Sequence, residues 1–531
     1  MSEIEILVNR ALVKHETNDN LLKTLQRDGI LLPSLCGGRK TCGRCGVRFV
    51  TNAPLPSHAD RNFFTPDKLR EGYRLACTSY VNQTCEIIIP HMEEEINNQE
   101  IESNILLKSY DIYKNVEHES VQKCFDTSST DAQLVIKKPH TMLTVDLGTT
   151  TVAVALVSGS VILKTISFVN PQRKYGTDVM SRISAKYGHS DMKNLIIKEI
   201  DTSIQEMFDY CSQEEISYPR YVVLAGNTTM DYLLLGIDPE SLGKAPFEFD
   251  RNIFKKSYPD IFSGKDSNGN RLPIESIIIP PASAFVGGDI VAGAIAKKLV
   301  AGELLIDLGT NGEIVLATEN GMLATATAAG PAFEGGSLVK GTASERLSEL
   351  YELLQNGQMD KTGCLTGASK LLTQEDIRQL QMAKSAIACG IEFLLDKAKM
   401  NYDDVKKVYL AGGFGYYLEV EKAAGIGLIP REFVGKTIAP GSTALLGAIQ
   451  IADMLLKVGK FGDKSAAINK VRNCDESENG DETRNIGEEN ISNEHINKLI
   501  MEINDFSQNI KAYNLAEYSG FQEKFIKNIN F

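Results

Sequence analysis

The amino-acid sequence predicts an α/β protein with a small β-rich domain followed by a larger, internally duplicated α/β domain. Residues 1–91 alternate apolar and charged positions, hold a glycine- and cysteine-rich loop, and end in a β-rich stretch at 85–90. Residues 92–139 are polar and without sustained period, which indicates a linker. Residues 140–531 form the second domain, which includes an acidic loop near 473–490 and a C-terminal helical segment.

An internal repeat indicates the architecture of the second domain. Residues 145–156 match 306–317, each being an apolar strand that ends in Asp, turns through Gly–Thr and returns as a strand. Residues 222–229 match 408–415, each a strand followed by a tight glycine turn and a helical pattern. Because both pairs occur in the same order, we expect two related α/β halves that face each other across a cleft.

Composition limits the partners. The chain has 531 residues and a net charge of −13, without a block of Lys or Arg, so neither nucleic acid nor an anionic membrane is an expected partner. The most apolar stretch, 277–300, is interrupted by Pro280, Pro281, Asp289 and Lys297, which are costly in lipid. The N-terminus lacks the pattern of a signal peptide, so a cytoplasmic location is expected. In a cytoplasmic protein, the ten cysteines indicate metal binding rather than disulfides.

Four cysteines have the spacing of a cluster site. Cys36, Cys42 and Cys45 are spaced C-x5-C-x2-C, and Cys77 follows 32 positions later. Plant-type ferredoxins hold a 2Fe–2S cluster with three thiolates from a tight loop and a fourth from a later segment of the chain. The loop is rich in glycine, as a backbone wrapped around a cluster requires. The five-residue first gap resembles the adrenodoxin-like ferredoxins.

A structural zinc site is the alternative for these cysteines, but such sites usually show two C-x2-C knuckles and only Cys42–Cys45 qualifies. Cys85 lies in an alternating strand and is expected in the core. The remaining cysteines are scattered and expected to be inert: Cys124, Cys211, Cys364, Cys389 and Cys474. Four basic residues surround the loop: Arg39, Lys40, Arg44 and Arg48. They either stabilise thiolates and dock an acidic redox partner, or form an ordinary solvated surface.

The two Asp–x–Gly–Thr hairpins predict a phosphate site. At Gly148, Thr149 and Thr150 the turn offers backbone N–H groups and hydroxyls to an anion, while Asp146 can hold Mg²⁺ through water. The second hairpin supplies four further residues from the opposite half: Asp307, Gly309, Thr310 and Asn311. Gly412 and Gly413 lack side chains, so the backbone can approach an adenosine and its α-phosphate.

The region from about 141 resembles the superfamily of acetate and sugar kinases, heat-shock chaperones and actin, which implies a duplicated actin-like (ribonuclease H-like) ATPase fold. With the N-terminal motif, the segments 225–230, 285–290, 306–315, 328–336 and 410–415 resemble the reductive activators of corrinoid proteins. Those proteins carry an N-terminal ferredoxin domain, a β-grasp fold with a 2Fe–2S cluster.

The resemblance implies that the chain reduces the Co(II) corrinoid of a methyltransferase corrinoid protein to Co(I), driven by ATP hydrolysis. Asp146 and Asp307 would then be the acids at Mg²⁺ and phosphate, Gly412 and Gly413 adenosine contacts, and the four cysteines the cluster ligands. An upstream electron donor is also implied, and homodimerisation is left open.

The sequence departs from the family pattern in two places: the segment after residue 337 is shorter, and the 92–139 region is short. Both departures concern the surface that would bind the corrinoid protein. Three alternatives stay open. An activator of another low-potential enzyme would usually hold a 4Fe–4S cluster between two ATPase subunits, and no cysteine pair in 141–531 has that pattern. A small-molecule kinase with an accessory ferredoxin, or a redox-sensing binding protein with little hydrolysis, would share the same motifs.

Overall fold

The computed structural model describes residues 3–8, 11–16, 19–27, 30, 32, 38–40, 43, 45–89, 140–176, 178–185, 188–309, 311–329, 343–415, 418–470 and 491–531. The predicted linker and the acidic loop lie entirely outside these residues, as do the segment after residue 337, Cys36, Cys42, Arg44, Cys124, Thr310 and Cys474. No helix in the described ranges combines the length and apolar character of a membrane span.

The N-terminal domain is a five-stranded sheet crossed by one helix, the β-grasp arrangement. Its strand order is β2-β1-β5-β3-β4, from β1 (Glu3–Val8), β2 (Ala11–Glu16), β3 (Gly46–Phe49), β4 (Tyr73–Leu75) and β5 (Cys85–Ile88). β1 pairs antiparallel with β2 and parallel with β5. Helix α1 (Leu21–Arg27) buries Leu21, Leu22 and Leu25 in the same core as Ile6 and Ile87. Two short helices, α2 (His58–Phe63) and α3 (Pro66–Arg70), lie between β3 and β4.

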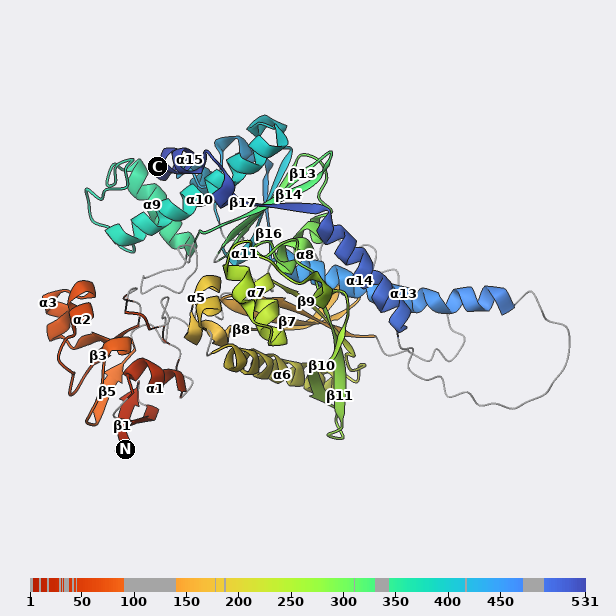
Figure 1. The fold of residues 1–531 in the computed structure, drawn as a ribbon, viewed down its shortest axis with the longest axis horizontal. Coiled ribbons are helices and arrows are strands. Elements are labelled where there is room, and N and C mark those ends of the chain that lie inside the picture. The colour runs from red at the N-terminus through yellow and green to blue at the C-terminus, as the bar shows by residue number, and fades with distance from the viewer. Residues whose placement is uncertain are drawn as a thin grey trace, which may run out of the picture.

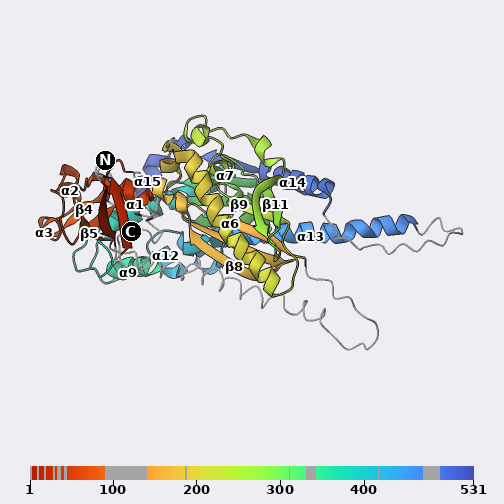
Figure 2. The same cartoon turned by 90° about the horizontal axis from the view of Figure 1, so that it is seen from below.

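The first half of the large domain has a six-stranded sheet of order β10-β11-β9-β6-β7-β8. The strands are β6 (Met142–Leu147), β7 (Thr151–Ser158), β8 (Val161–Val169), β9 (Tyr221–Gly226), β10 (Tyr258–Lys265) and β11 (Arg271–Ile278). Helices α5 (Val179–Ser184), α6 (His189–Gln213) and α7 (Thr228–Leu235) belong to this half. Ile196, Ile200 and Ile204 of α6 share a core with Leu143 and Val145, so the long helix covers one face of the sheet (Figure 2).

The second half repeats this plan with the strand order β16-β15-β12-β13-β14-β17. The strands are β12 (Glu303–Leu308), β13 (Gly312–Thr318), β14 (Gly321–Thr327), β15 (Lys407–Ala411), β16 (Thr437–Gly441) and β17 (Ile510–Asn514). Its helices are α9 (Ala343–Gln355), α10 (Gln374–Ala398), α11 (Gly412–Gly415), α12 (Val420–Gly425), α14 (Asn493–Gln508) and α15 (Phe521–Ile529). β6 pairs antiparallel with β7 and parallel with β9, and β12 pairs in the same way with β13 and β15. The predicted duplication is therefore correct.

Two helices join the halves: α8 (Gly288–Lys297) and α13 (Thr443–Lys470). A Cβ atom at Gly447 would lie 2.1 Å from the carbonyl oxygen of Ala292, so the two backbones approach as closely as glycine permits. One hydrophobic core contains Val223 of the first sheet, Leu305 of the second and Leu445 of α13. The fold class is confirmed: a ferredoxin-type domain precedes a duplicated actin-like domain.

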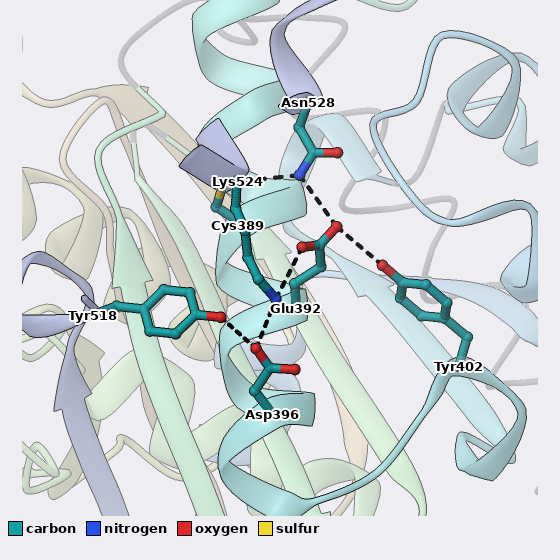
Figure 3. A network of polar contacts seen from close by, with 7 residues as sticks. All are labelled: Cys389, Glu392, Asp396, Tyr402, Tyr518, Lys524 and Asn528. Carbon is teal, nitrogen blue, oxygen red and sulfur yellow. Dashed lines mark hydrogen bonds and ion pairs between the residues drawn. The ribbon is translucent and has the colours of Figure 1, made fainter. Parts of the chain in front are cut away.

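The C-terminal segment packs against the second half. β17 adds to the sheet edge beside β14 in parallel, and α15 lies along α10 (Figure 1). The Lys524 ammonium is 2.6 Å from Asp396 and 3.2 Å from Glu392, both on α10. Tyr518 also donates to Asp396, while Tyr402 and Asn528 donate to Glu392 at 3.2 Å (Figure 3). One lysine of α15 therefore holds two carboxylates of α10.

A second lysine, on α10 itself, fastens the end of the chain. Lys384 is 2% exposed, and its ammonium donates to the carbonyl oxygens of Asn528 at 2.7 Å and Asn530 at 2.5 Å. Burial lowers the pKa of Lys384 to about 8. The ammonium satisfies carbonyls that the end of α15 leaves open.

Candidate nucleotide and cluster sites

The first hairpin joins β6 to β7 through residues 148–150. A Cβ atom at Gly148 would lie 2.4 Å from the Thr151 carbonyl oxygen, so the turn requires glycine. The side-chain amide of Asn227 donates to Thr149 Oγ1 at 2.9 Å, and its oxygen caps α7 by accepting from the Met230 N–H. The first strand–turn–helix motif thus contacts the first hairpin.

The second hairpin joins β12 to β13, and Asp307 is the penultimate residue of β12. Asp307 lies opposite Ala411 in the parallel ladder with β15. Gly412 follows with φ +88°, and a Cβ atom there would lie 2.7 Å from Asp307 Oδ1. Gly309 donates its N–H to the Asn311 carbonyl at 3.0 Å, and Gly413 lies in α11. The structure therefore brings Asp307 and Gly412 together, whereas Thr310 lies outside the described residues.

Four carboxyl groups interact where the hairpins meet. Burial, with the charges of Asp289 and Asp146 adding to it, raises the pKa of Asp307 to about 8. Burial raises the pKa of Asp146 to about 6, opposed by a 2.8 Å hydrogen bond from the Ser442 hydroxyl. Burial also raises the pKa of Asp289 to about 7, opposed by the Ile290 N–H and reinforced by Asp146. Asp146, Asp289 and Asp307 retain partial solvent exposure, as ligand-facing groups require.

Asp231 is the fourth member of the carboxyl group cluster, which we define as Asp146, Asp231, Asp289 and Asp307. Its side chain is fully buried, and neither carboxyl oxygen has a hydrogen-bond partner among the described residues. Burial and the charge of Asp289 raise its pKa well above the ordinary value. Four carboxyl groups that disfavour each other's ionisation fit a divalent cation, which would relieve that repulsion. In the described part of the chain no three His, Cys, Asp or Glu side chains are grouped so that they could hold a metal ion directly.

Sequence reasoning assigned no role to Asp231, Asp289, Asn227 or Ser442. Asp289 follows two glycines at the start of α8, and Asp231 lies in the first turn of α7. Acidic residues are common in the first turn of a helix because they interact favourably with the helix dipole. Their residue type and position in the sequence therefore did not indicate a functional role. Their shared location depends on strands paired from distant parts of the chain.

The cluster loop lies at one end of the N-terminal sheet. Cys45 precedes β3 and Cys77 follows β4, and Gly46 lies opposite Leu75 where these strands pair. Ala76 donates its N–H to the Cys45 carbonyl at 2.8 Å, which holds the two cysteine segments together. Both thiols are buried, at 2% and 1% exposure. These two residues fit a metal cluster at this end of the sheet, and the positive φ of Gly38 (+85°) and Gly43 (+68°) fits a tightly wrapped loop.

Cys85 behaves as predicted. It is 2% exposed in β5, within the core, and burial raises the pKa of its thiol to about 11. Arg39 and Lys40 are exposed at the surface beside the loop.

The fold and these sites define a class of protein, a ferredoxin-type domain joined to an ASKHA domain. Residues 8–82 match the model of the 2Fe-2S iron-sulfur cluster binding domain, and 142–301 match that of the RACo middle region. Residues 302–348 and 354–483 match the model of the C-terminal domain of RACo, the ASKHA domain. The chain belongs to the RACo family, the reductive activators of corrinoid proteins.

Individual relatives are more distant. The corrinoid activation enzyme RamQ of Eubacterium limosum is 26% identical over 374 residues, which are 56% of this chain and 61% of RamQ. The chain thus matches less than two thirds of that relative's length. A Na(+)-translocating NADH-quinone reductase component of Chlamydia pneumoniae is 43% identical over 76 residues, 14% of this chain and 18% of that component. A solved reductive activator for corrinoid, iron-sulfur protein superposes with a TM-score of 0.56 at 21% identity, covering 100% of this chain and 98% of that one, which shows a shared fold.

Proposed function

We propose that this chain is an ATP-hydrolysing electron-transfer protein that reduces the Co(II) corrinoid of a methyltransferase corrinoid protein to Co(I). The observation that carries the proposal is the carboxyl group cluster: Asp146 and Asp307 come from matching hairpins of the two halves, and the charge of Asp146 helps to raise the pKa of Asp307. A cation-dependent phosphate site in the same chain as a cluster-binding domain is what ATP-driven electron transfer requires. RamQ, a relative over the matched region, is named as a corrinoid activation enzyme.

In this proposal each half supplies one side of a Mg-ATP site. Asp146 and Asp307 would hold the hydrated Mg²⁺, and the turns at 148–150 and 309–311 would bind phosphates through backbone N–H groups and hydroxyls. Gly412 and Gly413 let the backbone lie against the adenosine. Asp231 and Asp289 lie among the same charges, and a bound cation would reduce the repulsion between them.

Cys36, Cys42, Cys45 and Cys77 would hold the 2Fe–2S cluster, which supplies one-electron transfer when bound. Each turnover moves one electron from an upstream low-potential donor to one cobalt ion. Plant-type clusters lie near about −400 mV, and an acceptor roughly 100–200 mV lower costs on the order of 2–5 kcal/mol per electron. ATP hydrolysis can offset that cost by changing the acceptor complex, because the cluster's own potential is set by its ligands and their hydrogen bonds.

The test is Co(I) formation by a purified Co(II) corrinoid protein, followed by its visible spectrum under anaerobic conditions. We expect Co(I) when a reductant, Mg-ATP and the intact chain are all present. Asp307→Ala should accept an electron from a strong donor yet fail to pass it on, while Cys42→Ser should bind nucleotide yet also fail. Asp260→Asn removes an exposed carboxylate of the first half and should behave as wild type.

Three outcomes contradict the proposal. Co(I) formation at full rate without ATP would separate the ATPase from electron transfer. ATP-dependent reduction of a different low-potential enzyme, with no effect on the corrinoid protein, would favour the activator alternative. Phosphoryl transfer to a small molecule, with no hydrolysis stimulated by the corrinoid protein, would favour a kinase.

A further inference from the structure

A segment between β8 and α6 forms hydrogen bonds with the first hairpin. We name it the bracket: residues 170–176 and 178–185, which include the turn Pro171–Tyr175 and helix α5. Asn170, fully buried, donates its backbone N–H to the Thr150 carbonyl at 2.7 Å. Its side-chain amide donates to the Gly148 carbonyl at 2.9 Å. Two carbonyls of the turn are therefore fixed by one residue of the bracket.

Arg182 fixes the carbonyl between them. Its guanidinium is fully buried, and Nη2 donates to the Thr149 carbonyl oxygen at 2.5 Å. Nε donates to the Gly176 carbonyl at 3.0 Å, and Nη1 contacts Gln172 Oε1 at 3.3 Å and Met230 Sδ at 2.9 Å. These contacts tie the planar guanidinium to the bracket and to α7 at once. Arginine suits such a position because its donors form a rigid fork.

The direction of these bonds has a consequence for the other side of the turn. In a trans peptide the C=O and the following N–H point in opposite directions. Holding the carbonyls of Gly148 and Thr149 toward the bracket therefore aims the N–H groups of Thr149 and Thr150 away from it. A donor on a peptide carbonyl also polarises that peptide, and a cationic donor does so most strongly, which makes its N–H a better donor to an anion.

We propose that Arg182 is a positioning residue for the nucleotide phosphates, which orients and polarises the first hairpin without touching the ligand. The inference rests on the nucleotide function proposed above and adds a residue to it. A role in the packing of the fold alone would affect all ligands of the site in the same way. A role in orienting the turn affects those that carry phosphates.

The test compares the affinities of the full chain for Mg-ATP and for adenosine, measured by titration calorimetry. Arg182→Met should weaken Mg-ATP binding about tenfold or more, the loss of a charge-assisted hydrogen bond, and leave adenosine affinity within about twofold. Arg182→Lys keeps a cation but loses the fork, so its Mg-ATP affinity should lie between those of Arg182→Met and wild type. Lys384→Met is the matched control, since it removes another buried cation that binds backbone carbonyls, and it should leave both affinities unchanged.

Equal losses for ATP and adenosine, or a similar loss in Lys384→Met, would overturn the proposal, as would wild-type ATP affinity in folded Arg182→Met. If Arg182→Met does not fold, Asn170→Ala is tested instead, because it removes the neighbouring hydrogen bond to the Gly148 carbonyl. It should show a smaller loss of Mg-ATP affinity with adenosine affinity unchanged. An equal loss of both affinities in Asn170→Ala would overturn the proposal. A wild-type chain that binds no ATP would instead refute the proposed function. A chain that binds ATP without reducing cobalt would refute that function and leave the role of Arg182 measurable.

Discussion

Ser442 and Asp146 belong to different halves of the large domain, and the Ser442 hydroxyl donates to Asp146 Oδ2 at 2.8 Å. The serine precedes α13, and the aspartate is the penultimate residue of β6, the strand that leads into the first hairpin. This bond favours the ionised carboxylate against the effect of burial. One hydrogen bond thus joins the two halves and adjusts the charge of the proposed magnesium site.

Removing this hydroxyl should shift the pH dependence of nucleotide binding. Ser442→Ala removes a donor to the carboxylate, so the pKa of Asp146 should rise above about 6. Because the carboxylate attracts Mg²⁺ when ionised, the acid limb of Mg-ATP affinity should move to higher pH, with a loss of up to about tenfold near pH 6.5. Ser442→Thr retains the hydroxyl and is the control. An unshifted acid limb in Ser442→Ala would show that this bond does not set the charge of the site.

The stability of the metal-free protein should fall as pH rises. Asp307 has a folded-state pKa near 8 against an ordinary 3.8, so its favourable contribution is complete below pH 3.8 and is lost as pH rises through about 8. In EDTA the melting temperature should therefore decrease between pH 6 and 8. Asp307→Asn should flatten this slope, and Mg-ATP should oppose the decrease in wild type. A pH-independent melting temperature in this window would contradict the assignment of a strongly raised pKa.

The cluster ligands should be separable from the core cysteine. Anaerobically purified protein is expected to hold two irons and two labile sulfides per chain, and Cys42→Ser should lose or distort the visible spectrum. Cys85→Ser should keep the cluster, because that thiol lies in the core, but should lose about 1–3 kcal/mol of unfolding free energy for a buried hydroxyl. Stoichiometric zinc in place of iron would end the electron-transfer proposal.

The contact between α15 and α10 should contribute measurable stability. Lys524→Met leaves Glu392 and Asp396 one helical turn apart without the ammonium they share. We expect a loss of roughly 1–3 kcal/mol in urea unfolding, since the site is partly buried. The double variant Lys524→Met, Glu392→Gln should recover part of the loss. If the double variant is no more stable than Lys524→Met, the lost stability comes from the packing of the lysine side chain rather than from its charge.

Local pattern was enough to predict the architecture. The repeated strand–Asp–Gly–Thr pattern identified both β6–β7 and β12–β13, because a hairpin and its turn are encoded by adjacent residues. The alternating strand around Cys85 placed that residue correctly in the core for the same reason.

The contacts behind the site could not be predicted in this way. Arg182 is 33 positions from Thr149, and Ser442 is 296 positions from Asp146. An arginine in a short helix and a serine before a long one are ordinary surface or capping residues in sequence terms. Their roles depend on which faces meet after the sheets assemble, and one sequence carries no direct record of that.

The bracket also contacts the N-terminal domain, where the Gln26 side-chain amide of α1 donates to the Lys174 carbonyl at 2.6 Å. A neutral hydrogen bond of this kind contributes only about 1 kcal/mol. Because both partners belong to one covalent chain, however, the contact forms at an effective concentration, which tethering commonly sets near the millimolar range. Under the function proposed above, a contact of this strength would let the ferredoxin-type domain separate from the bracket and bind it again.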